Sequence, residues 1–439
     1  MTSRLLIPVV AVTLLPATAL LVSLLLSGLP TFHVAEDAAI IELNTLDASK
    51  GYQLLGLYSR FGFHYFGPAM FYVLAPFYRL SGCKYAILPV TAALLNLTVL
   101  FLLIVLVARI GSVGAAVCFC FIMLMYSLYL GPWHFQSVWN PYLPLLAFLF
   151  SVFSCGGLLC NRHRYMPLTV LAGMFAAQSH VAYAVPLIAV GTVTLVFYAF
   201  PLLRITLGVS KELVRMPRST LAISMIVLLL ALVPVLLEQA TAEQGNITKM
   251  LKYSSEPGLR VGLVQSINVV ATTTGSFLIA PACSVRQMLE NPWTTEPKFT
   301  GAQKAIAAIL ALGQFIVLPF IWRIAKRESN YLPCALVWIT SVLVLSAVFW
   351  VSRLPAPLDV YLVRWISGIG VISTFTVISP LISSITRFLE RRCGSALKWI
   401  IPTALVAVAA LLSALNLGLV VRMPTLSTRA AQPKNQTIR

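Results

Sequence analysis

Residues 36–80 read EDAAIIELNTLDASKGYQLLGLYSRFGFHYFGPAMFYVLAPFYRL, and they directly follow an opening apolar segment that carries almost no charge. Four acidic side chains and a series of aromatic ones are therefore concentrated where the chain leaves its first hydrophobic segment. Charge is scarce elsewhere, because only 10% of the 439 residues are charged, 59% are hydrophobic and the mean hydropathy is +0.90. This composition excludes a soluble protein of this size and indicates a polytopic membrane protein.

The fold class follows from the need to pair every peptide group inside hydrocarbon. The sequence lacks alternating strand-like segments, so we predict an all-α fold. Apolar stretches of about 17–25 residues predict about eleven transmembrane helices in a single integral membrane domain, 1–439. We expect these helices near residues 5–28, 86–108, 113–130, 143–160, 166–181, 183–203, 219–237, 302–322, 331–350, 358–385 and 397–421.

Short basic links between alternate spans predict the orientation. They comprise Arg109 and the basic residues within 162–164, 204–218, 323–327 and 387–398. The positive-inside rule places these links and Arg4 in the cytoplasm. Because successive spans alternate in direction, the same orientation puts a first outer loop, 29–85, a second large outer loop, 238–301, and the tail 422–439 on the outer face. Residues 261–281 are apolar but rich in Thr, Ser, Asn and Gln, so we expect a membrane-surface or re-entrant segment there rather than a twelfth crossing.

Glu36 and Asp37 stand where the chain leaves the first span and begins a short helix. One interpretation is that Asp37 is a first-turn acid that complements the helix dipole. The other is a functional carboxylate, because an acid this close to the membrane boundary is costly to desolvate. Nine of the 13 acidic residues lie in the two large loops, so an enzyme that needs a carboxylate would have it on the outer face.

The aromatic segment LYSRFGFHYFGPAMFYVLAPFY, residues 57–78, includes Tyr58, Arg60 and His64. Pro68 and Pro76 break any long straight helix here. An interfacial aromatic belt explains the rings well. It explains Arg60 and His64 less well.

An acid just after the first span, a short loop helix and the segment FGFHYFGPAMFY together resemble the first outer loop of the GT-C superfamily of integral membrane glycosyltransferases. This superfamily includes the protein O-mannosyltransferases and the lipid A aminoarabinose transferases. In many bacterial members of this dolichyl-phosphate-mannose-transferase-like group, a His-Pro pair and an apolar run occupy this position. Here Tyr65, Phe66 and Gly67 separate His64 from Pro68. The acids run Glu-Asp instead of the familiar Asp-Glu, so the resemblance leaves open which one is catalytic.

The resemblance implies an inverting glycosyltransferase of the bacterial inner membrane. It would move a sugar from a polyprenyl-phosphate donor to a glycan, lipid or protein acceptor at the outer face. Asp37 or Glu36 would take the acceptor's proton as general base, and cations would hold the lipid phosphate. Arg60, Arg353 and Lys298 are the phosphate candidates. The planar fork of arginine favours Arg60 and Arg353, although each cation could instead be a snorkelling anchor. No cofactor motif is present, and a divalent metal at the phosphate stays open.

Further polar side chains at the expected outer face are candidates for substrate binding. Trp139 and Asn140 lie in the turn 131–144, and Gln178 and His180 interrupt an apolar stretch that is too long for one crossing. Tyr58 and His64 of the first loop complete this set. The alternatives are an aromatic belt for the turn and a satisfied buried histidine at His180.

The net charge of +18 is dispersed among the links, which indicates attraction to anionic lipid in the bilayer and no nucleic-acid partner. Neither a phosphate-binding loop nor a zinc motif is present. Two other function classes remain: a transporter or flippase of a lipid-linked saccharide, and a non-catalytic membrane scaffold. Transporters show paired repeats and polar breaks near the bilayer midplane. The polar residues here gather at one face instead, which favours an enzyme.

Overall fold

The computed structural model describes residues 3–30, 34–212, 214–255, 258–291, 297–392 and 397–423. These residues form helices joined by loops, with two isolated β-bridges, so the predicted all-α membrane fold is confirmed. In the first half of the chain the helices are α1 (Ser3–Leu26), α2 (Glu36–Ser49), α3 (Ala69–Leu80), α4 (Ile87–Ile110), α5 (Val113–Gln136), α6 (Leu145–Leu159), η1 (His163–Tyr165), α7 (Met166–Ser179), α8 (Val181–Ala199) and α9 (Pro201–Thr206). The second half contains α10 (Arg218–Thr241), α11 (Asn246–Ser255), α12 (Leu263–Glu290), α13 (Gly301–Arg327), α14 (Tyr331–Arg353), η2 (Val360–Leu362), η3 (Arg364–Ile366), α15 (Ser367–Arg392) and α16 (Leu397–Val421).

Ten of the described helices are long and apolar enough to cross a membrane: α1, α4, α5, α8, α10, α12, α13, α14, α15 and α16. Two predicted crossings are shorter, because α6 has 15 residues and α7 has 14. Every residue of α6 is buried, so this helix lies at the centre of the bundle. Because neighbouring helices surround α6 on all sides, this helix needs no lipid-facing surface.

One predicted span has a different beginning. We expected a helix from residue 358, but residues 354–366 form a loop with two short 3-10 turns, and α15 begins at Ser367. Asp359 and Arg364 are charged, and Pro355 and Pro357 lack a backbone N–H, so this stretch is poorly suited to a membrane helix. The correction matters because the loop contributes side chains to the candidate site.

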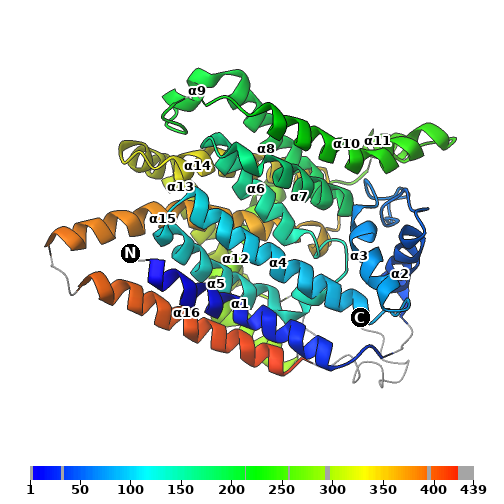
Figure 1. Ribbon diagram of the computed structural model, residues 1–439, viewed down its shortest axis with the longest axis horizontal. Coiled ribbons are helices and arrows are strands. Elements are labelled where there is room, and N and C mark those ends of the chain that lie inside the picture. Colours follow the sequence, from blue (N-terminus) through cyan, green and yellow to red (C-terminus); the bar gives the residue numbers. More distant parts are fainter. Residues whose placement is uncertain are drawn as a thin grey trace.

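The two ends of the bundle carry different segments (Figure 1). At one end the indole of Trp322 donates to Leu207 O at 2.8 Å, Lys326 Nζ donates to Thr206 O at 2.7 Å, and Asn161 Nδ2 donates to Ser210 Oγ at 2.7 Å. These contacts bring together the basic links 161–165, 204–212 and 322–330, and we call this the basic end. Helices α2, α3 and α11 lie at the opposite end, at the right of Figure 1, which we call the loop end.

Helix α12 was predicted as a surface or re-entrant segment, whereas its length and composition alone would allow a crossing. Its start is fixed to the end of α14, where the Val261 N–H donates to Leu354 O at 3.0 Å. Its other end places Met288 against Gly131, near the end of α5. Both of these partners belong to the loop end. The contacts therefore favour a helix that begins and ends at the loop end over a twelfth crossing.

A close helix contact fixes α12 against α13. A Cβ atom on Gly275 would lie 1.9 Å from the carbonyl oxygen of Ala307, so any larger residue would force the two backbones apart. Protein interiors are packed too tightly to absorb such a shift without cost. Gly275 thus sets the distance between α12 and α13.

Candidate active site

Asp37 lies in the first turn of α2, at the loop end, and its side chain is exposed. Its Oδ2 accepts a hydrogen bond of 2.8 Å from the indole Nε1–H of Trp139, which lies 102 positions further along the chain. The neighbouring Glu36 is also exposed and has a positive φ of 54°, and its side chain has no hydrogen bond or ion pair among the described residues. Of the two candidate acids, the structure joins Asp37 to the other predicted site residues.

Aromatic rings surround the partner of Asp37. The Trp139 ring lies 5.3 Å from the ring of Tyr361, and Tyr65 lies 4.4 Å from the imidazole of His180. Burial raises the pKa of Tyr65, and the nearby Tyr361 and Asp37 raise it further. Burial likewise raises the pKa of Tyr361. Both phenols therefore stay neutral at physiological pH, and the partly exposed Tyr361 can donate a hydrogen bond to a ligand.

Arg60 is held beside these rings. Its guanidinium forms an ion pair with Asp359 and lies 5.0 Å from the ring centroid of Phe61 and 5.8 Å from that of Tyr361. Both charged side chains are partly exposed, at 50% and 39%, so water weakens their attraction. Arg60 is thus positioned by stacking as well as by charge. A ligand anion can reach it without opening a buried pair.

A small hairpin explains why Arg60 stands where it does. The Tyr65 N–H donates to Leu57 O at 2.9 Å and the Ser59 N–H donates to Phe63 O at 2.8 Å, with Gly62 in the left-handed region at φ 85°. Glycine adopts that conformation without steric cost. Arg60 is therefore at the tip of a tight turn. We call the group formed by Asp37, Arg60, Tyr65, Trp139, Asn140, His180, Asp359 and Tyr361 the Asp37 cluster.

His64 and Tyr58 belong to the same hairpin and face each other, with ring centroids 5.0 Å apart. His64 Nδ1 lies 2.9 Å from Gly56 O, and its backbone is fixed from both sides by the side chain of Asn246, at 2.8 and 2.9 Å. Asn246 in turn donates its backbone N–H to the buried carboxylate of Glu238. These contacts give His64 a role in joining the first loop to the second. Tyr58 is 53% exposed and stays available to a substrate.

The next contacts concern three residues that we expected to bind substrate. Gln178, Asn140 and His180 instead make hydrogen bonds that hold backbone segments in place. The Gln178 side chain accepts from the Ala69 N–H at 3.2 Å and donates to Ala231 O at 2.7 Å. Asn140 Nδ2 donates to Ser179 O at 3.0 Å. His180 is fully buried and accepts the Ala182 N–H at the start of α8, and burial lowers its pKa to about 3. The neutral imidazole caps α8 through Nδ1, whereas its buried Nε2 has no hydrogen-bond partner among the described residues, so the satisfied-histidine interpretation holds for only one ring nitrogen.

The other two phosphate candidates lie apart from the cluster. The Arg353 guanidinium lies 5.5 Å from the ring of Phe349, and Lys298 is held through its backbone by Gln287. No hydrogen bond, ion pair or ring contact within the described part of the chain joins either residue to Asp37 or Arg60. The tail 422–439 lies outside the described residues except for Arg422 and Met423.

Sequence reasoning missed Tyr361 and Asp359, because both were assigned to a span. The acid at 359 inside an otherwise apolar stretch was the available signal. Among the described residues no group of three His, Cys, Asp or Glu side chains is close enough to hold a metal ion. The Asp37 cluster offers one exposed carboxylate, one arginine and several rings, which suits a carbohydrate and an anion together.

Comparison with known proteins relates the chain to one fold. No family model matches the sequence, and no curated protein is similar to it at a significant level. The crystal structure of ArnT from Cupriavidus metallidurans bound to undecaprenyl phosphate matches 93% of this chain and 76% of its own, with a TM-score of 0.51 and 15% identity. The apo structure of the same protein matches with a TM-score of 0.50 and 14% identity. This chain therefore has the fold of ArnT, an aminoarabinose transferase of the GT-C type.

Proposed function

We propose that this protein is a membrane glycosyltransferase that moves a sugar from a polyprenyl-phosphate donor to an acceptor at the loop end, with Asp37 as general base. The observation that carries the proposal is the hydrogen bond of 2.8 Å between Asp37 Oδ2 and the indole of Trp139. It fixes an exposed carboxylate against a ring that contacts Tyr361, and Arg60 lies over the ring of Tyr361. The ArnT-like fold and the undecaprenyl phosphate bound to ArnT support a donor of this class.

The chemistry requires one oxygen of Asp37 to be free. Trp139 occupies Oδ2, and Oδ1 has no hydrogen-bond partner in the described part of the chain. Oδ1 would take the proton of an acceptor hydroxyl as its oxygen attacks the anomeric carbon. The bond from that carbon to the lipid phosphate breaks, and its electron pair leaves with the phosphate oxygen. Attack opposite the leaving group inverts the anomeric centre.

Arg60 would stabilise the charge on the departing phosphate. Its guanidinium is stacked near Tyr361 and pairs with the partly exposed Asp359, so a more highly charged phosphate can compete for it or share it. Charge stabilisation at the leaving group is often the largest contribution to such catalysis. Arg353 and Lys298 remain secondary candidates, and the loop end would face away from the cytoplasm.

The test uses purified protein in detergent with a polyprenyl-phosphate sugar and a panel of glycan, lipid and peptide acceptors. We expect the wild type to release the sugar from the donor and Asp37→Asn to be slower by about 100-fold or more, because the amide cannot accept the proton. Glu36→Gln is the matched control and should retain activity.

Loss in Glu36→Gln with activity retained in Asp37→Asn would move the role of base to Glu36. Activity retained in both variants would refute the mechanism. A wild-type protein that binds the donor yet never releases its sugar to any acceptor would contradict the transferase proposal and favour a lipid-saccharide transporter.

A further inference from the structure

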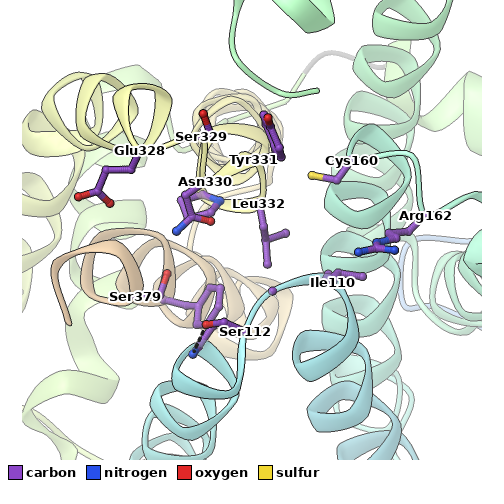
Figure 2. Close-up of a pocket in the computed structure, with 14 residues that line it drawn as sticks. Ile110, Ser112, Cys160, Arg162, Glu328, Ser329, Asn330, Tyr331, Leu332 and Ser379 are labelled. Atoms are coloured by element: carbon purple, nitrogen blue, oxygen red, sulfur yellow. Dashed lines mark hydrogen bonds between the residues drawn. The ribbon is translucent and has the colours of Figure 1, made fainter. Parts of the chain in front are cut away.

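Charge is balanced differently at the two ends of the bundle. A cavity of about 360 Å³ at the basic end is lined by one charge of each sign, Arg162 and Glu328, which lie on opposite sides of it (Figure 2). The Asp37 cluster instead combines two carboxylates, Asp37 and Asp359, with the single guanidinium of Arg60. The cluster therefore contains more negative than positive charge before any ligand binds.

The ring of Tyr361 connects these three charges. Trp139, which donates to Asp37, lies 5.3 Å from it, and the guanidinium of Arg60 lies 5.8 Å from its centroid. Burial raises the pKa of Tyr361, and the positive charge of Arg60 lowers it. The negative charges of Asp359 and Asp37 raise this pKa further. All three charges thus act on one phenol, within one small region of the loop end.

The loop that carries Asp359 is fixed before and after this residue. Before it, the Ala356 N–H donates to Leu259 O at 3.1 Å, which ties the loop to the segment that precedes α12. After it, residues 362–366 are all buried in the bundle. A ligand that approaches Arg60 therefore meets the Asp359 carboxylate already in place.

Arg60 has capacity left for a further anion. One of its terminal nitrogens pairs with Asp359, and its other N–H groups have no hydrogen-bond partner among the described residues. Guanidinium presents several N–H donors in a planar fork that matches phosphate oxygens. If a phosphate binds the free edge of the fork, it shares one guanidinium with Asp359, so the two anions lie close together. Their repulsion then grows with the charge of the phosphate group.

We propose that Asp359 is a specificity-determining residue that restricts the lipid donor to a single phosphate group and disfavours a diphosphate. This inference rests on the proposed function, because it concerns the headgroup of the donor. A diphosphate link carries one negative charge more than a monophosphate link. Arg60, already shared with Asp359, would leave that extra charge uncompensated beside two carboxylates. The same difference of one charge separates the two lipids after the sugar has left.

The test compares undecaprenyl phosphate with undecaprenyl diphosphate, which have the same chain, so that contacts with the chain cancel. Binding to the full-length protein in detergent is measured by native mass spectrometry and calorimetry, without divalent cations, which would neutralise the diphosphate. We expect the wild type to bind the monophosphate about 10-fold or more tightly, as one additional charge close to a partly exposed carboxylate implies. This preference should decrease as the salt concentration rises, because salt screens exposed charges.

Three variants separate the charge of Asp359 from its position. Asp359→Asn keeps an oxygen that can accept from Arg60 but removes the charge, so the preference should fall to about twofold through tighter binding of the diphosphate. Asp359→Glu keeps the charge and should keep the preference. Asp47→Asn is the matched control, because Asp47 is exposed and lies ten positions beyond Asp37 on α2, about 15 Å along the helix. It should leave the preference within about twofold of the wild type.

Several outcomes would overturn the inference while the proposed function stands. They are wild-type binding of the diphosphate that equals or exceeds binding of the monophosphate, a full preference in Asp359→Asn, and an equal loss of preference in Asp47→Asn. A preference lost through weaker binding of the monophosphate would show that Asp359 only positions Arg60. Binding of neither lipid would overturn both the inference and the proposed donor. The wild-type preference and its salt dependence test the inference even if a variant fails to fold.

Discussion

The loop end and the basic end both contain polar side chains in a largely apolar bundle, but they use them differently. At the loop end, the exposed carboxylate of Asp37 has one hydrogen bond within the described part of the chain, and Arg60 pairs with the partly exposed Asp359. At the basic end, Arg204 is only 2% exposed, donates to Leu159 O and Asn161 Oδ1, and stacks on Tyr198. A buried charge that is held by hydrogen bonds and by stacking supports the fold, whereas an exposed charge with few contacts can serve a ligand. The number of contacts that a charge makes therefore indicates its role better than its position in the sequence does.

The largest effect expected tests whether the two ends lie on opposite sides of the membrane. Cys83 is exposed at the loop end. We expect a membrane-impermeant maleimide to label it in intact cells or sealed spheroplasts, and Cys83→Ser to reduce the labelling to what the partly exposed Cys283 contributes. A cysteine introduced by Glu212→Cys in the Cys83→Ser background should react only after permeabilisation. Labelling of position 212 from outside would contradict the orientation.

The next prediction tests whether the buried charge of Arg204 at the basic end stabilises the fold. Arg204→Met should lower the free energy of unfolding by about 2–4 kcal/mol, because two charge-assisted hydrogen bonds to otherwise buried oxygens are lost. Denaturant unfolding in detergent measures the change. Arg164→Met is the control, because the Arg164 guanidinium is exposed, and its hydrogen bond and its ring contact within the described part of the chain are both with the side chain of Tyr165. This control should alter the free energy of unfolding by less than about 1 kcal/mol. Equal losses in both variants would remove the distinction between the two arginines.

A smaller effect, on the use of the donor, is expected at the loop end when Arg60 is replaced. Arg60→Ala should weaken the use of the donor by about 1–3 kcal/mol if the guanidinium contacts the phosphate. Arg60→Lys should recover only part of this, because the fork is lost. Steady-state kinetics with varied donor measure both variants, and Lys50→Ala controls for a general loss of charge at this end. If Asp359→Asn impairs the enzyme as much as Arg60→Ala does, Arg60 serves only to pair with Asp359.

The smallest effect concerns the orientation of the carboxylate. Trp139→Phe keeps a ring but removes the hydrogen bond to Asp37, so we expect a loss of about 0.5–1.5 kcal/mol in transition-state stabilisation. This corresponds to roughly a 2–10-fold lower kcat with little change in KM. A change in KM alone would make Trp139 a substrate-stacking residue instead of a positioning residue.

Much of the fold could be predicted from the sequence, because hydrocarbon imposes length and composition on each crossing. The loop helix that begins at Glu36 and the span that ends at Val421 were expected and are present. The predicted start of the α15 span at residue 358 was wrong, because the hydrophobic residues around Tyr361 concealed a loop. Periodicity carries no information on contacts between distant segments. Only the structure therefore reveals the hydrogen bond from Trp139 to Asp37 and the one from the Ala69 N–H to the Gln178 side chain.

The contact between Asn246 and His64 has a consequence for how the chain is produced. Residues 246–248 read Asn-Ile-Thr, a sequence that marks an acceptor for N-linked glycans in secretory compartments. The Asn246 side chain is 3% exposed, and both ends of its amide are bound to the His64 backbone. A glycan added to the nascent chain would prevent the two loops from meeting, whereas the folded protein would hide the amide from the modifying enzyme. Expression in a eukaryotic secretory host should therefore yield two populations, an unglycosylated folded form and a glycosylated form that is retained and degraded.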